Sequence, residues 1–273
     1  MSTQEYITIH QGNSSVSVHL HGATVTSWKC DGQEMLFVSK NAIYNNKKAI
    51  RGGIPVIFPN FGPWELGPQH GFARTSRWTL KETNENSDES KAVFTLQDSE
   101  ETNKMWNYKF CVSYILLLRK KEFEARLQVE NIGSEEFKFT TLLHTYLSVS
   151  DVNKSTISGL QGLQYIDKVC GGKTFTEDRE LVGVQENYDR VYMSTPNTHV
   201  VTNSTGGRSI RITKTNFPDT VVWNPWIEKA KGMSDFGDDE YLCMLCVEAG
   251  HVASPLTLSA GGVFEGKQVL SIC

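Results

Sequence analysis

The sequence lacks any apolar run that approaches the ~20 residues needed to cross a bilayer as a helix. Its start also lacks the basic region and apolar segment that mark a secretory signal peptide. No block of basic residues occurs, and the formal net charge is −4. Surfaces that bind nucleic acids are rich in Lys and Arg. We therefore expect a cytoplasmic protein without a membrane or nucleic-acid partner.

Cysteines are few and do not repeat in a metal-binding pattern. The sequence has six, and without a secretory signal we expect them to be reduced thiols. Cys243 and Cys246 have the spacing of a metal knuckle, but no second pair accompanies them. They lie in an apolar run that predicts a strand, on which residues three apart point to opposite faces. We interpret both as buried core thiols and expect no metal site.

Helical periodicity is scarce, whereas alternation of apolar and polar residues is common. The best helical segment, 226–233, is short. Apolar residues recur at every second position over 110–118 and 123–129, on either side of a polar turn, which predicts a long antiparallel hairpin. The same kind of reading predicts further strands at 16–20, 92–97, 137–149, 199–203, 208–214, 220–224, 241–249, 255–259 and 267–272.

More than ten strands with almost no helix favour an all-β fold. We expect a large antiparallel β-sandwich with few short helices. The polar segments 81–91 and 232–240 are expected to be exposed loops that are too short to separate domains. Because no internal repeat is apparent, we expect residues 1–273 to form a single domain, and we expect it to act as a monomer.

The most distinctive segment, residues 51–74, is rich in glycine and contains four prolines. In a helix interior Gly costs about 1 kcal/mol and Pro about 3 kcal/mol, and each Pro removes a donor from a strand ladder. The segment is therefore predicted to be a shaped loop with short strands. An arginine offers a planar fork of donors that matches a phosphate. The residues suited to grip an anionic, hydroxyl-rich ligand are Arg51, Gln69, His70 and Arg74.

Two further residues are candidates for acid–base chemistry. On the strand predicted at 137–149, His144 shares a face with Thr140, Leu142 and Tyr146, a mixture suited to the wall of a sugar site. The alternative is a histidine that is satisfied within a packed sheet or exposed on its outer side. Glu248 ends an apolar run, where a carboxylate is costly unless it is paired or lies in a cleft. Alternatively, the strand reaches solvent at this point.

Other polar and aromatic residues could bind a sugar. Asp189 could accept hydrogen bonds from hydroxyl groups, or it could form an Asx turn or a surface ion pair. Trp223 and Asn224 place an indole beside an amide, and indoles stack on the apolar faces of sugars, although buried tryptophans are usually core residues. His19 and His21 share a strand face, but no third metal ligand accompanies them. We interpret these two histidines as surface residues.

Taken together, these segments resemble the glucose-6-phosphate 1-epimerase (hexose-6-phosphate mutarotase) branch of the aldose 1-epimerase family. The resemblance spans most of the chain, and the matching stretches 51–55 and 69–74 together are quite specific. The unphosphorylated galactose branch usually shows a His-Pro-Tyr-Phe-Asn type of motif at the position of His144-Thr-Tyr-Leu, which favours the sugar-phosphate branch. The matching stretches occur in the order of the family at 51–55, 69–74, 144–146, 189–192, 222–226 and 246–248.

The resemblance implies a galactose-mutarotase-like supersandwich with an open sugar-binding groove. It also implies an isomerase that exchanges the α and β anomers of a hexose 6-phosphate, foremost glucose 6-phosphate. Glu248 matches the catalytic base and His144 the catalytic acid. The chemistry requires no metal, nucleotide or redox cofactor, so we expect a small-molecule hexose phosphate as the partner. By the resemblance, substrate-binding positions fall at Arg51, Gln69, Arg74 and Asp189, with His70 as a second active-site histidine.

Alternative functions remain open from the sequence. One is an aldose 1-epimerase that acts on unphosphorylated sugars. Another is a non-catalytic module that binds a sugar phosphate for regulation. The presence of both His144 and Glu248 favours an enzyme, because binding alone does not need a pair of groups that transfer protons.

Overall fold

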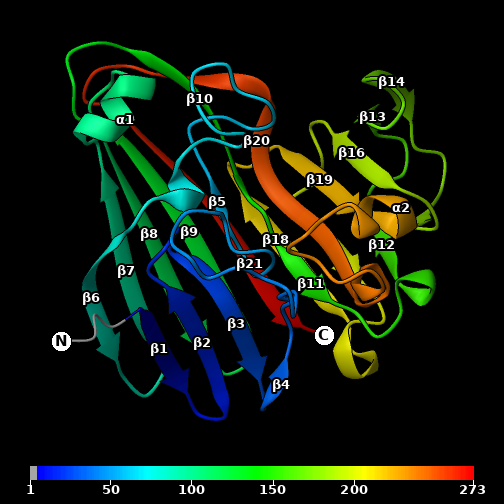
Figure 1. Ribbon diagram of the computed structural model, residues 1–273. Helices are drawn as coiled ribbons and strands as arrows, with labels where there is room; N and C mark the ends of the chain where they lie inside the picture. Colours follow the sequence, from blue (N-terminus) through cyan, green and yellow to red (C-terminus); the bar gives the residue numbers. More distant parts are fainter. Residues whose placement is uncertain (1–4) are drawn as a thin grey trace.

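The computed structural model describes residues 5–273, whose strands form three sheets (Figure 1). All pairings between these strands are antiparallel. The predicted antiparallel β-sandwich is therefore confirmed. The expectation of a single domain also covers residues 1–4, which lie outside the described residues.

The smallest sheet consists of consecutive strands near the N-terminus: β1 (Tyr6–Gln11), β2 (Ser14–His19), β3 (Thr24–Cys30) and β4 (Gln33–Glu34). The nine-stranded sheet contains, in spatial order, β15 (Leu181–Gly183), β12 (Thr156–Ser158), β17 (Thr198–Val201), β18 (Ile210–Thr215), β21 (Val263–Ile272), β9 (Glu122–Asn131), β8 (Phe110–Arg119), β7 (Ser90–Gln97) and β6 (Thr79–Glu85).

The eight-stranded sheet carries the residues of greatest interest. Its long strand β20 curves through the middle of the molecule (Figure 1). In spatial order the sheet contains β14 (Lys173–Thr176), β13 (Gln164–Asp167), β16 (Tyr188–Tyr192), β19 (Asp219–Asn224), β20 (Met244–Leu258), β10 (Phe137–Leu143) and β5 (Val56–Ile57), and β11 (Tyr146–Ser148) also pairs with β20.

Helices are short, as expected. Helix α1 (Glu100–Met105) begins at a capping box in which Ser99 and Thr102 each satisfy a backbone N–H group of the other. Helix α2 (Trp226–Lys231) confirms the predicted helical segment, whereas α1 was not predicted. No helix among residues 5–273 is long and apolar enough to span a membrane. The single 3₁₀ turns are η1 (Ala73–Thr75), η2 (Val152–Lys154), η3 (Thr205–Gly207) and η4 (Glu240–Cys243).

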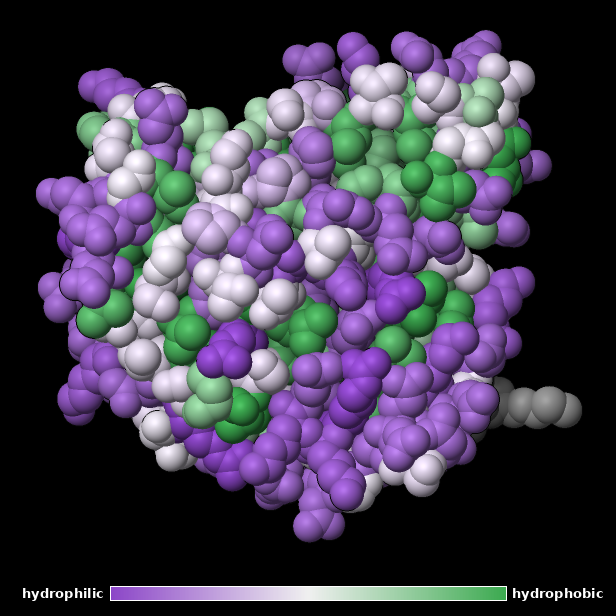
Figure 2. All heavy atoms as spheres, turned by 180° about the vertical axis from the view of Figure 1, so that it is seen from behind, coloured by the Kyte–Doolittle hydropathy of each residue, from purple (hydrophilic) through white to green (hydrophobic). Residues whose placement is uncertain are grey.

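The predicted hairpin is confirmed as β8 and β9, which pair from Phe110↔Asn131 to Arg119↔Glu122. Side chains of β8 alternate between buried and partly exposed over most of the strand, which is the period that its sequence shows. A continuous core of buried apolar side chains reaches from Ile7 in β1 to Leu270 in β21. The outer face seen in Figure 2 is mostly hydrophilic, and its hydrophobic residues form separate groups.

Several predicted segments differ from the structure. The predicted strand 137–149 is interrupted at residues 144–145, between β10 and β11. The predicted strands 241–249 and 255–259 are parts of one strand, β20, which begins only at Met244. The predicted loop 81–91 is mostly the hairpin of β6 and β7, because β6 is an edge strand whose polar side chains face solvent.

The interpretation of His19 and His21 as surface residues was wrong. They are only 4% and 2% exposed, because a backbone hydrogen bond and ring contacts satisfy them inside the fold. His21 Nε2 lies 2.8 Å from the carbonyl oxygen of Lys48, and the His19 ring packs edge-on against Tyr6. The two cysteines also differ from expectation, since Cys246 is buried whereas Cys243 is exposed at the end of η4.

Gly53 allows the loop that carries Arg51 to lie directly against β3. Its φ is +67°, and a Cβ atom at this position would collide with the carbonyl oxygen of Val25. We expect Gly53→Ala to lower the free energy of unfolding by about 3 kcal/mol, from backbone strain and this clash. Urea denaturation measures the change. The matched control is Gly12→Ala, which has a similar φ of +59° but open space around its Cβ position. Equal losses in both variants would show that close packing at Gly53 has no effect.

Candidate functional site

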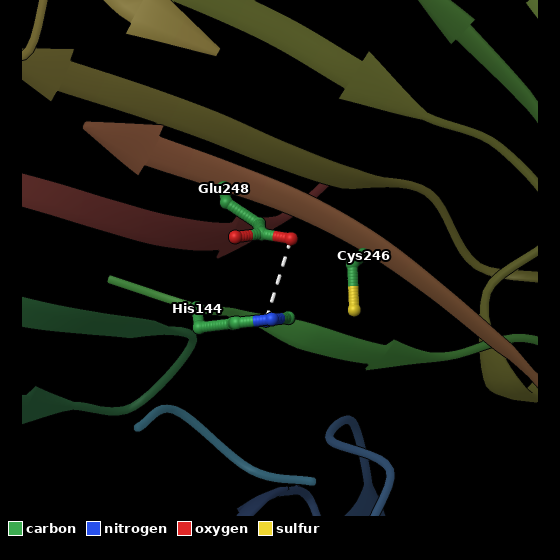
Figure 3. Close-up of side chains that lie close together, drawn as sticks. All are labelled: His144, Cys246 and Glu248. Atoms are coloured by element: carbon green, nitrogen blue, oxygen red, sulfur yellow. Dashed lines mark ion pairs between the residues drawn. The ribbon is translucent and has the colours of Figure 1, made fainter. Parts of the chain in front are cut away.

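Strand pairing brings His144 and Glu248 together on one face of the eight-stranded sheet. Glu248 lies on β20, where it pairs with Val221 of β19. On the other side of β20, β10 ends at Leu143↔Ala249 and β11 begins at Tyr146↔Cys246. His144 occupies the break between β10 and β11. Its ring therefore points toward the carboxyl group of Glu248 (Figure 3).

The two side chains are buried and close. The His144 Nδ1 atom lies 3.3 Å from Glu248 Oε1, and the side chains are 10% and 1% exposed. The two atoms are not aligned as a hydrogen bond, and both His144 Nδ1 and Glu248 Oε2 are buried without a hydrogen-bond partner. Buried polar atoms are costly when they are left unpaired. Such atoms at the wall of an open cavity are suited to a polar ligand.

Burial acts on the charges of both groups. It raises the pKa of Glu248 well above its ordinary value, an effect that Asp189 reinforces and that Lys168 and Arg74 oppose. Burial also lowers the pKa of His144 well below its ordinary value, and His70, Arg74 and Arg51 add to this effect. In the free protein, the surroundings of each group therefore favour its neutral form.

Three residues, Cys246 among them, offer potential metal ligands. One ligand atom from each of His144, Cys246 and Glu248 lies within 4.8 Å of the others (Figure 3). A metal would require the thiolate and the carboxylate, but burial raises the pKa of the Cys246 thiol and of the Glu248 carboxyl. The guanidinium group of Arg74 also acts on Glu248 and would repel a cation. The absence of a metal site stays a prediction.

A first wall next to the pair comes from the loop segment 51–74. Arg51 donates to the Tyr146 hydroxyl at 3.3 Å and forms an ion pair of 3.2 Å with Asp235. Tyr146 in turn stacks on the His144 ring, with centroids 4.6 Å apart. Arg74 donates to the carbonyl oxygen of Gln69 at 2.9 Å, and its Nε is buried without a partner.

His70 lies on the same wall. Its ring centroid is 6.1 Å from that of His144 and 5.2 Å from that of Phe61. Burial lowers the pKa of His70 to about 3, and the cations Arg74, Lys168 and Arg51 contribute. His70 is therefore neutral near pH 7, so it can donate or accept a hydrogen bond but adds no positive charge.

The opposite wall comes from β16, β19, α2 and the turn after β13. Asp189 lies between two ammonium groups: Lys229 Nζ is 3.9 Å from its carboxylate, and Lys168 acts on its charge. Lys168 Nζ lies 3.8 Å from the centroid of the Phe61 ring. Trp223 is mostly buried, and the centroid of its ring lies 6.0 Å from that of His144.

These walls enclose a cavity of about 390 Å³. Seven of the residues proposed from sequence line it together with Glu248, which is the arrangement expected for one binding site. Sequence reasoning missed Lys168, Lys229 and Asp235, because isolated charged residues in turns or a short helix give no periodic or motif signal. The cavity is lined by Arg51, Phe61, Gly62, Pro63, Gln69, His70, Arg74, His144, Lys168, Asp189, Val221, Trp223, Lys229, Met233 and Glu248.

Asn224 is the exception among the predicted site residues. It is fully buried and does not line the cavity. Its amide group donates to the carbonyl oxygens of Tyr241 and Met244, and its Oδ1 accepts from the Trp226 backbone. Its side chain fastens the start of α2 to the start of β20, so we no longer propose it as a substrate-binding residue.

The sequence matches a protein-family model described as aldose 1-epimerase over residues 5–271. Two curated relatives carry the description "Putative glucose-6-phosphate 1-epimerase". The relative from Cenchrus ciliaris is 36% identical over 268 residues, which cover 95% of this chain and 82% of that protein. The relative from Escherichia coli K12 is 35% identical over 252 residues, which cover 91% and 84%.

A solved structure agrees with these matches. It is the crystal structure of a protein from Salmonella typhimurium described as a "putative mutarotase". The sequence identity is 31%, the TM-score is 0.91, and the alignment covers 98% of this chain and 90% of the other. Nearly the whole chain therefore has a counterpart of known structure.

Proposed function

The chain belongs to the aldose 1-epimerase family, and on that premise we propose that it exchanges the α and β anomers of a hexose 6-phosphate, with glucose 6-phosphate as the substrate. The observation that carries this proposal is the buried pair of His144 and Glu248, 3.3 Å apart at the wall of a cavity lined by cations. The names of the relatives and the resemblance of the sequence to the sugar-phosphate branch support the choice of substrate.

Anomer exchange requires two proton transfers on one sugar ring. A base removes the proton of the anomeric hydroxyl while an acid protonates the ring oxygen, and the ring opens to an aldehyde. After rotation about the bond between the first two carbons, the same groups act in reverse and the ring closes. We assign Glu248 as the base and His144 as the acid. Each such group typically contributes about 10²–10⁴-fold to the rate.

The phosphate of the substrate would favour the charged form of His144. Arg74 and Arg51 lower the pKa of His144 in the free protein. A bound phosphate dianion offsets the positive charge of Arg74, so the pKa of His144 rises and its imidazolium form becomes accessible. In this proposal, the charged group of the substrate prepares the acid that protonates the ring oxygen.

The decisive experiment is NMR exchange spectroscopy between the two anomers of glucose 6-phosphate. We expect exchange cross-peaks that grow with protein concentration above the spontaneous rate. Because the two anomeric protons resonate separately, the rate is read without a coupled assay. Exchange that does not increase with added protein would overturn the proposal of an enzyme and leave the alternative of a regulatory sugar-phosphate-binding module.

The same experiment with free glucose tests the alternative of an aldose 1-epimerase acting on unphosphorylated sugars. A higher kcat/KM for free glucose would favour that alternative.

The proposal also includes a cytoplasmic monomer and a single domain. The continuous core that reaches from β1 to β21 supports the single domain.

A further inference from the structure

Building on the proposed function, we propose that Lys168 is a phosphate-binding residue and that it shares the phosphate of the substrate with Arg74. Neither the sequence motifs nor the printed names of the relatives point to Lys168. It lies in the turn that follows β13, about a hundred residues from Arg74 along the chain. The argument depends on which cations of the cavity already have a negative partner.

Four cationic side chains line the cavity, and two of them are already paired. Arg51 forms an ion pair of 3.2 Å with Asp235, and Lys229 forms one of 3.9 Å with Asp189. Within the described part of the chain, Arg74 and Lys168 form no ion pair, as the salt bridges show. The cavity therefore holds four cations against two carboxylates, and neither Arg74 nor Lys168 has a carboxylate at ion-pair distance among the described residues.

The directions of the pKa shifts of these cations agree with the ion pairs. Burial opposes the charge of Arg51, but Tyr146 and Asp235 outweigh burial and raise its pKa. By contrast, burial lowers the pKa of Arg74 to about 10, and the nearby charge of Arg51 adds to this effect. Desolvation also lowers the pKa of Lys168, and the charges of Asp189 and Glu248 only partly oppose this effect. An anion placed near Arg74 and Lys168 would relieve this cost.

Local contacts hold Lys168 on the cavity side of the sheet. Its backbone N–H donates to the carbonyl oxygen of Asp189 at 2.9 Å. Its ammonium group lies 3.8 Å from the centroid of the Phe61 ring, and a Cβ atom on Gly62 would be 4.0 Å from it. The Phe61 ring in turn contacts the ring of His70. Lys168 is thus joined by Phe61 to the wall that continues through His70 and Gln69 to Arg74.

A phosphate monoester fits this arrangement by charge. With its second pKa near 6, it carries close to two negative charges at pH 7. Asp235 compensates Arg51, and the single charge of Asp189 is divided between Lys229 and Lys168, so the four cations keep an excess of two positive charges. Arg74 can present a planar fork of donors to the phosphate, and Lys168 can add a point charge on a flexible stem. An unphosphorylated hexose would leave both cations uncompensated.

The test uses a ligand that binds but cannot react. 1,5-Anhydroglucitol 6-phosphate lacks the anomeric hydroxyl, and 1,5-anhydroglucitol also lacks the phosphate. Calorimetric titration of Lys168→Met should show binding of the phosphorylated ligand weakened by about 10-fold or more, as for a lost charge-assisted hydrogen bond. The affinity for the unphosphorylated ligand should not change. Because Lys168 lies in a turn with part of its side chain exposed, the variant should fold normally.

Lys231→Met is the matched control. Lys231 is an exposed lysine of α2 that forms an ion pair with Glu228 and does not line the cavity. We expect it to change the affinity for the phosphorylated ligand by less than about 3-fold, because exposed ion pairs contribute little. Unchanged affinity in Lys168→Met, or equal weakening of both ligands, would overturn the role of Lys168.

This result is separable from the test of the proposed function. If wild-type protein binds the phosphorylated ligand through Lys168 but does not accelerate anomer exchange, the phosphate site stands and the enzymatic proposal fails. If exchange is accelerated and Lys168→Met binds the phosphorylated ligand normally, only the assignment of Lys168 fails.

Discussion

Glu248→Gln is expected to lower kcat for anomer exchange by at least about 100-fold, because an amide cannot accept the proton of the anomeric hydroxyl. Glutamine has nearly the same shape, so the cavity and the neighbouring ring of His144 should be retained. Binding of 1,5-anhydroglucitol 6-phosphate should therefore stay close to that of the wild type. NMR exchange gives kcat, and calorimetry gives the affinity. A variant that keeps more than a tenth of the activity would rule out Glu248 as the base.

The raised pKa of Glu248 predicts the pH dependence of the wild-type enzyme. As pH falls, the carboxylate is protonated at a higher pH than an ordinary glutamate with a pKa of about 4.3. On the acid side, kcat/KM should therefore decline at a pH above that value. The residual activity of Glu248→Gln should lack this decline.

Stability offers an independent check on the same carboxylate. A folded-state pKa above the unfolded value favours folding while the group is protonated, and this contribution disappears as pH rises through the folded-state pKa. Glutamine stays neutral throughout. Glu248→Gln should therefore resist urea better than the wild type at neutral pH, and the difference should shrink toward acid pH. Lower stability of the variant at neutral pH would indicate that the surroundings of Glu248 stabilise its carboxylate, and that burial of this charge does not destabilise the folded protein.

His144→Ala is expected to reduce kcat by about 10²–10⁴-fold, because the ring oxygen loses its proton donor. The shape of the pH–rate profile should change as well, since one of two coupled groups no longer titrates. Alanine leaves space for a small base, so added imidazole should restore part of the activity if the ring itself transfers protons. An unchanged pH–rate profile would count against His144 as the acid.

His251→Ala provides the control for this variant. His251 lies on β20, three residues beyond Glu248, but it does not line the cavity. It is partly exposed, so its removal should leave kcat within about 3-fold of the wild type, as for a surface substitution away from the site. A loss equal to that of His144→Ala would point to general damage to the strand.

The sequence predicted the architecture where one face of a strand is buried. The hairpin of β8 and β9 has this alternation, and both strands lie where expected. The signal fails at the eight-stranded sheet, where β20 is buried on both faces in its first half and reads as a continuous apolar run. It also fails at the edge strand β6, whose polar residues look like a loop.

The candidate site could be predicted only where residues form motifs. The loop segment 51–74, His144 after β10 and Glu248 in an apolar part of β20 combine unusual residues with unusual positions. Lys168 and Asp235 have neither, since an isolated Lys or Asp in a turn is common on any surface. Their partners become visible only in three dimensions, where Asp235 pairs with Arg51 and Lys168 lies over Phe61. Asn224 shows the converse, because a distinctive local motif serves to fasten α2.

The proposed acid–base pair and the proposed phosphate-binding residues are held by different parts of the fold. Backbone pairing to β20 sets the spacing of His144 and Glu248, whereas Arg74 and Lys168 extend from a loop and a turn. During evolution, changes in this loop and this turn could therefore allow substrates with a different charged group. The spacing between the strands, on which the proposed ring opening depends, would not change. A single scaffold can in this way diversify its substrates while its reaction stays constant.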